Sequence, residues 1–206
     1  LDTFVLPTGT RGTDWIELSA NQCTLYYTSE DTTVRRYNVC TRSALPDFAS
    51  GLTAPYCYAL RLRPNGELMV ACQEAVHRLS AQGANLRTYT RQSIGETDAA
   101  GLFALNLDPD GTSFWTAGLN SGSVFRVDIA SGAVLASFNS GAGGVGGLAV
   151  YDELGETDVL LADGFEGSAT VAARVVPADS ARGEAPAPDA GPADPHHALP
   201  LRPQPP

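Results

Sequence analysis

The stretch FALNLDPDGTSFWTA, residues 103–117, decides the architecture of this chain. It contains an apolar segment, a polar turn and a second apolar segment, which predicts two antiparallel strands joined by a tight turn. Three other stretches align with it: WIELSANQCTLYYT (15–28), YALRLRPNGELMVA (58–71) and GLAVYDELGETDVLLA (147–162). The chain is therefore interpreted as four copies of one structural unit.

The four copies follow one another at a nearly constant spacing. The equivalent apolar residues Leu18, Leu62, Leu107 and Val150 are separated by 44, 45 and 43 residues. A third strand follows in each copy, with arginine at its third position: Arg36, Arg78, Arg126 and Arg174. A fourth strand with the pattern Leu-x-x-aromatic follows at 45–48, 86–89 and 135–138, and the same pattern stands at 1–4. Four strands at this period are typical of a propeller blade.

The two ends of the chain complement each other. The N-terminus supplies a fourth strand alone, and the last repeat supplies three strands without a fourth. We therefore predict an all-β fold over residues 1–176, a β-propeller of four four-stranded repeats whose N-terminal strand completes the last blade and hides the sheet edges. Part of a larger six- or seven-bladed ring and a twisted sandwich are the alternatives. Residues 177–206 are rich in Pro and Ala and predict a disordered tail or linker.

The segment NLDPDGTSFWTA, followed by VFRVDIASGAVLASFN, resembles the repeat of the YVTN, NHL and gluconolactonase-like propellers. The resemblance covers residues 1 to about 176. It implies the fold rather than one function, because these propellers include lactonases, lyases, binding proteins and scaffolds. Most of them have six or seven blades, so the resemblance leaves open whether four repeats form the whole ring.

Four cysteines fit two disulfides. Cys23 opens a second strand and Cys40 closes a third, while Cys57 opens a first strand and Cys72 ends a second. Antiparallel neighbours bring such ends to the Cα spacing of about 5.5 Å that a disulfide needs. We therefore predict the pairs Cys23–Cys40 and Cys57–Cys72 and an oxidising compartment, extracellular or periplasmic. Four buried thiols in a cytosolic propeller are the alternative, and the lack of a CxxC pair disfavours a zinc site.

Composition excludes some classes of partner. The net charge of −10 argues against nucleic acid, whose phosphates require clustered Lys and Arg. No apolar stretch approaches the roughly 20 residues that span a bilayer. The sequence starts at Leu1 without a charged-then-apolar leader, and both a processed mature end and an excised segment fit this start.

Carboxylates gather in the segments that lead into first strands and in the turns between second and third strands. They are Asp14, Glu30, Asp31, Glu74, Glu96, Asp98 and Glu166, and they predict a negative face. Asp14 and Asp98 precede first strands and are the candidate ligands for Ca²⁺, which takes six or more oxygen atoms. The alternative is that these are ordinary solvated acids. The equivalent positions in the other repeats hold Pro55 or Tyr56 and Gly143–Gly146, so no acidic ring is completed.

Aromatic residues mark the same end of the strands. Trp15, Tyr58 and Phe103 stand at the predicted channel entrance of three repeats and form a candidate ligand-binding collar, although packing between blades explains such residues equally well. No histidine is placed as a base for nucleophilic catalysis, because His77 lies within a third strand and the other two lie in the tail.

These observations predict a secreted or cell-surface β-propeller that acts as a binding or interaction module without catalysis of its own. Its partner would be a protein, a glycan or a small molecule. Two other functions remain open. One is a metal-dependent hydrolase of the lactonase type that uses Asp14 and Asp98, and the other is a structural subunit of a larger surface assembly.

Overall fold

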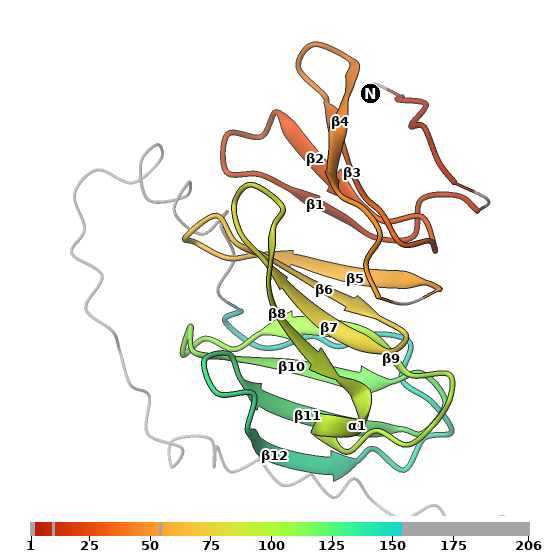
Figure 1. Ribbon diagram of the computed structural model, residues 1–206, viewed down its shortest axis with the longest axis vertical. Helices are drawn as coiled ribbons and strands as arrows, with labels where there is room; N and C mark the ends of the chain where they lie inside the picture. The colour runs from red at the N-terminus through yellow and green to blue at the C-terminus, as the bar shows by residue number, and fades with distance from the viewer. Residues whose placement is uncertain (1–2, 10, 54, 154–206) are drawn as a thin grey trace, which may run out of the picture. The chain divides into compact units, whose positions relative to one another are not determined.

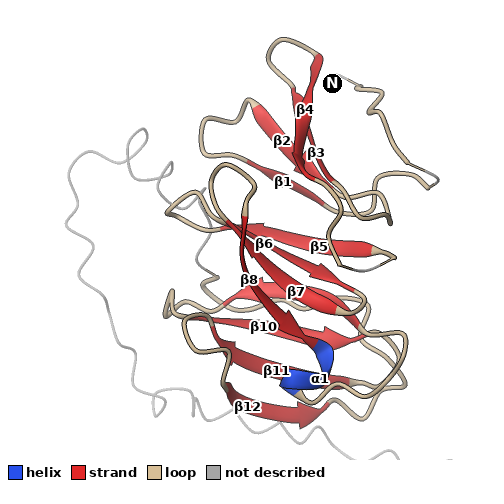
Figure 2. Ribbon diagram, in the orientation of Figure 1, coloured by secondary structure: helices blue, strands red, loops and turns tan. Residues whose placement is uncertain are grey.

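A computed structural model describes residues 3–9, 11–53 and 55–153 of the 206-residue chain (Figure 1). The chain divides into two units, residues 1–167 and 168–206, and the second lies outside the described residues. Strands and loops make up almost all of the described part, with one single-turn helix, α1 (Arg91–Ile94) (Figure 2). Within these ranges no helix has the length and apolar character needed to cross a membrane.

The described strands form three four-stranded sheets (Figure 1). The first sheet contains β1 (Ile16–Leu18), β2 (Thr24–Tyr27), β3 (Val34–Asn38) and β4 (Ser43–Ala49). The second contains β5 (Cys57–Leu62), β6 (Leu68–Cys72), β7 (Ala75–Leu79) and β8 (Asn85–Thr90). The third contains β9 (Leu102–Leu107), β10 (Ser113–Gly118), β11 (Ser123–Asp128) and β12 (Val134–Asn139).

Each sheet is an antiparallel meander in chain order, and the three sheets repeat one register. The first hairpins pair Leu18 with Leu25, Leu62 with Leu68 and Leu107 with Phe114. The arginines of the third strands pair with the same position of the second strands: Arg36 with Tyr26, Arg78 with Met69 and Arg126 with Trp115. The sequence repeat is therefore a structural repeat, and the architecture is that of a β-propeller, as the period predicted.

The core lies between successive sheets. β1 contacts β5, and β5 and β6 contact β9. In β6 all five residues are buried, because a sheet covers each face. Leu68, Val70 and Cys72 belong to the cluster that includes Val34 and Phe48 of the first sheet. The alternate residues Met69 and Ala71 belong to the cluster that includes Leu105 and Phe114 of the third sheet. This is the period-two alternation of a strand with both faces packed.

Both disulfides are those predicted. Cys23–Cys40 joins the ends of β2 and β3 with a Cα–Cα distance of 5.2 Å, and Cys57–Cys72 joins β5 to β6 at 3.9 Å. Each closes a short loop, with sequence separations of 17 and 15 residues. A crosslink of this length contributes about 3 kcal/mol by restricting the unfolded chain. The two bonds indicate an oxidising compartment.

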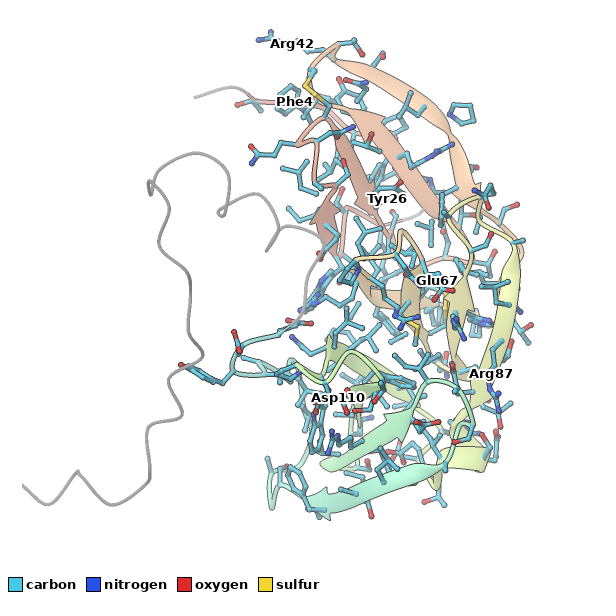
Figure 3. All side chains as sticks on the ribbon, turned by 90° about the vertical axis from the view of Figure 1, so that its left-hand side faces the viewer. Phe4, Tyr26, Arg42, Glu67, Arg87 and Asp110 are labelled. Carbon is cyan, nitrogen blue, oxygen red and sulfur yellow. A yellow bond between two sulfur atoms is a disulfide. The ribbon has the colours of Figure 1, made fainter. Side chains whose placement is uncertain are left out.

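The two expected end strands differ from prediction where they are described. Residues 3–9 form no strand, and instead the Phe4 ring lies 5.8 Å from that of Tyr37 and beside Arg42 (Figure 3). The Tyr27 hydroxyl also donates a hydrogen bond to the Pro7 carbonyl at 2.7 Å. Residues 147–150, expected as the first strand of the fourth repeat, are irregular. The rest of that repeat and residues 177–206 lie outside the described residues, so closure of a four-bladed ring stays a prediction.

Candidate binding face at the start of the inner strands

We call the end of the sheets where β1, β5 and β9 begin the strand-start face. One backbone hydrogen bond recurs there between neighbouring sheets. The residue that opens each new first strand donates its backbone N–H to the turn between the second and third strands of the preceding sheet. Cys57 donates to Asp31 at 2.9 Å, and Leu102 donates to Gln73 at 3.1 Å. Val145 repeats the contact with Leu119 at 3.2 Å. These bonds hold the connecting loops and the turns of neighbouring sheets at one face.

Three of the six described acids of this face are ion-paired, so the predicted negative charge of the face is partly balanced. Three carboxylates form ion pairs with arginines: Glu30 with Arg11 at 2.9 Å, Asp31 with Arg35 at 2.6 Å and Glu74 with Arg91 at 2.9 Å. The sequence expectation counted the acids on these loops but did not assign them to individual arginines. Glu166 lies outside the described residues.

Glu96 is a buried structural carboxylate rather than a solvated acid. It is only 1% exposed, and its Oε1 accepts a hydrogen bond from the Asp98 N–H at 2.7 Å. Its Oε2 accepts from the Ser121 hydroxyl at 2.6 Å. A Cβ atom at Gly118 would collide with that oxygen, so a larger residue there would displace the carboxylate. Glu96 therefore ties the loop before β9 to the turn between β10 and β11.

Asp14 differs from these paired acids. Its side chain is partly buried, and its Oδ2 is shielded from solvent without a hydrogen-bond partner among the described residues. Burial, and then the nearby charge of Glu30, raises the pKa of the Asp14 carboxyl. The position thus holds an acceptor oxygen whose hydrogen-bonding capacity is unused.

Asp98, the second predicted metal ligand, is used within its own loop. Its Oδ1 accepts a hydrogen bond from the Ala100 N–H at 2.7 Å, and its carbonyl accepts from the Arg91 guanidinium at 3.1 Å. In residues 3–9, 11–53 and 55–153, no three His, Cys, Asp or Glu side chains form a group that could hold a metal ion. A Ca²⁺ site at Asp14 and Asp98 would therefore need oxygen ligands from elsewhere, and it stays a prediction.

Two of the three predicted collar residues meet. The rings of Tyr58 and Phe103 lie 4.8 Å apart across the boundary between the second and third sheets. Trp15 instead packs against both core clusters and lies under the Arg61 guanidinium, 5.1 Å from its ring centre. Burial, followed by the charges of Glu30 and Asp14, raises the pKa of the Tyr58 hydroxyl. Tyr58 and Asp14 therefore share one environment, which the sequence predicted only as membership of the same face.

Sequence reasoning missed a second set of polar residues. They lie in the middle of β1, β5 and β9, the first strand of each sheet, which we call the inner strands. Glu17, Arg61 and Asn106 each stand between the two apolar residues of a first strand, so they occupy one repeat position. Arg61 lies 3.8 Å from Glu17 and 2.8 Å from Glu153, which also contacts Asn106. We call these four residues the central polar cluster. The signal that would have found it is the shared repeat position of Glu17, Arg61 and Asn106 in the first strands.

A groove of about 380 Å³ lies on the third sheet. It is lined by Trp115, Val124 and Phe138 together with Asp108 and residues 148–151. Phe138 is 55% exposed there. This is the face on which a further blade would pack, and the segment after β12 begins to cover it.

Comparison with known proteins supports the fold and not a family. The sequence matches no described protein family and no curated protein. Among solved structures, the chain is similar to one described as "Crystal structure of WD40 beta propeller domain of Doa1", with a TM-score of 0.58 and 15% sequence identity. The match covers 69% of this chain and 46% of that one, so the chain spans about half of that propeller's length. The chain is a β-propeller repeat protein.

Proposed function

We propose that the chain is a secreted or cell-surface β-propeller that binds a partner at its strand-start face and catalyses no reaction. The fold supports this proposal, since propellers commonly serve as interaction modules, and the two disulfides fit an exported protein. The partner would be a protein, a glycan or a small molecule.

The unused Oδ2 of Asp14 is the observation that carries the proposal. A buried acceptor without a donor costs about 1–3 kcal/mol, and a ligand hydroxyl, amide or ammonium that reached it after a local side-chain rearrangement would recover part of that cost. Aromatic surface lies at the same face, because Tyr56 is 42% exposed and Phe103 is partly exposed. A polar anchor beside apolar surface is the usual composition of a specific binding site.

Binding arrays with matched variants test this proposal. The wild-type protein is screened against glycans and extracellular protein domains, and each hit is measured with Asp14→Asn and Phe103→Ala. We expect both variants to weaken binding at least fivefold, while Gln82→Ala, in the turn between β7 and β8 at the opposite end of the sheet, leaves it unchanged. Binding that survives both substitutions would place the partner elsewhere.

The metal-dependent hydrolase is the second candidate, and the same buried oxygen of Asp14 is what favours it. Thermal unfolding with Ca²⁺ and with EDTA, followed by hydrolysis of a lactone panel, separates the two functions. A binding module gives no hydrolysis above the blank under either condition. Hydrolysis that requires Ca²⁺ and is lost in both Asp14→Asn and Asp98→Asn would replace the first proposal.

A further inference from the structure

We propose that the inner strands of the second and third sheets form a carboxylate-binding cradle, which Glu153 of the chain itself occupies in this structure. Three donors from these strands converge on the Glu153 carboxylate. Its Oε1 accepts hydrogen bonds from Arg61 Nε at 2.8 Å and from the Leu107 N–H at 2.7 Å. Its Oε2 accepts from the Asn106 side-chain amide.

The backbone donor follows from the sheet order. Among the described strands β9 lies at the edge of its sheet, so alternate N–H groups of β9 have no partner in the ladder. The Leu107 N–H is one of these, and it points toward the same carboxylate as the two side chains. A charged guanidinium, an amide and a free backbone N–H are together the groups that recognise carboxylates in proteins.

The cradle is held in place by contacts other than Glu153. The Arg61 guanidinium stacks over Trp15, donates to the Leu60 carbonyl at 2.9 Å and lies 3.8 Å from Glu17. The Arg61 side chain is only 14% exposed. Its position is therefore set before any carboxylate binds, which lowers the entropic cost of binding.

Glu153 satisfies the cradle only in part. Asn106 is 2% exposed, and its Oδ1 is buried without a hydrogen-bond partner among the described residues. The ionised carboxylate of Glu153 can only accept hydrogen bonds, so it cannot serve this oxygen. A ligand with a hydroxyl or ammonium group next to its carboxyl would serve both atoms of the Asn106 amide. The chemical class is therefore a small carboxylate that carries such a donor.

The segment that delivers Glu153 is built as a removable occupant. It follows β12, the last described strand, and is irregular, and Tyr151 beside it is 96% exposed. Asp152 has a φ of 59°, a left-handed conformation that costs a non-glycine residue about 1 kcal/mol. In the sequence repeat Glu153 corresponds to the turn residues Asn21 and Asp110, yet here it reaches the middle of the inner strands.

Chemical rescue in the 206-residue chain tests the proposal. Glu153→Ala empties the cradle and is expected to lower the melting temperature. Acetate and lactate, up to about 100 mM and compared with chloride at equal ionic strength, should raise the melting temperature of Glu153→Ala and leave the wild type unchanged. Lactate should bind about fivefold more tightly than acetate, because its hydroxyl reaches the Asn106 oxygen. Equal responses to chloride and acetate, or equal responses of wild type and variant, would overturn the cradle.

A second background keeps the test decisive. Arg61→Met in the Glu153→Ala chain should abolish the rescue. If that double variant does not fold, binding of ¹³C-labelled lactate and of ¹³C-labelled acetate is measured by NMR with Glu153→Ala and with Glu153→Ala/Asn106→Ala. Loss of the lactate preference over acetate in the second protein supports the assigned role of Asn106. An unchanged preference, or equal affinity for the two acids in Glu153→Ala itself, refutes the donor-bearing class.

Discussion

Replacing Glu67 by glutamine tests how the hairpin turns of the repeat are held. Glu67 lies in the turn between β5 and β6, and its carboxylate contacts Arg78 of β7 at 2.7 and 2.8 Å and also pairs with Arg63 (Figure 3). Its side chain is 13% exposed. The hydrogen bonds from Arg78, with help from Asn65 and Arg63, lower the pKa of the Glu67 carboxyl from 4.5 to about 2.

The magnitude follows from linkage. A folded-state pKa below the unfolded value adds stability that is complete above the unfolded pKa and is lost as the pH falls through the folded pKa. For Glu67 that window runs from pH 4.5 down to about 2. The full shift corresponds to roughly 3 kcal/mol. Arg78 is 26% exposed, and solvent screening at this rim reduces the expected value to about 1–2 kcal/mol.

Urea unfolding at pH 7 and at pH 2–3 measures this effect. Glu67→Gln should unfold about 1–2 kcal/mol more easily at pH 7, and its difference from the wild type should shrink as the pH approaches 2. Glu74→Gln is the matched control, because its side chain is 37% exposed and its pair with Arg91 should contribute less than about 0.5 kcal/mol. A Glu67→Gln protein as stable as the wild type at pH 7, or a difference independent of pH, would refute the reasoning.

Three further predictions concern stability. Burial lowers the pKa of His77 below 6.5, so the free energy of unfolding should fall as the pH drops below 6.5. The fall should be at most about 1.4 kcal/mol per pH unit, and His77→Gln should lose this dependence in urea titrations. Gly118→Ala should cost about 1–3 kcal/mol by calorimetry, whereas Gly143→Ala, with nothing within 4 Å of its added Cβ, should cost little. Alkylation should add four groups by mass spectrometry only after reduction, and the reduced chain should lose about 3 kcal/mol per disulfide.

The repeat could be predicted because each copy carries the same local pattern of apolar and polar residues. Alternating apolar residues and polar turns placed the strands, and the strand ends then placed Cys23 against Cys40 and Cys57 against Cys72. Prediction failed where a segment has the alternating pattern of a strand but does not pair with a neighbouring strand. Leu148 and Val150 alternate like a first strand, but the segment is irregular and lies against the third sheet.

The site was less predictable, because its chemistry depends on contacts between distant residues. Asp14 was found from its place before a first strand, but its unused oxygen is a property of the packed face. Glu153 joins Arg61 across 92 residues and Asn106 across 47, and no local spacing reports such pairs. A single polar residue between two apolar ones also looks like ordinary strand alternation.

Because β6 packs on both faces, this strand couples the stability of the second sheet to that of the first and of the third. Leu68 and Val70 couple it to the first sheet, while Met69 couples it to the third. In a linear array of repeats, stability is a sum of unit and nearest-neighbour terms. Truncating Leu68 or Val70 should therefore loosen the packing of β6 against the first sheet, and truncating Met69 should loosen its packing against the third. Alternate residues of this five-residue strand thus connect the second sheet to two different neighbours.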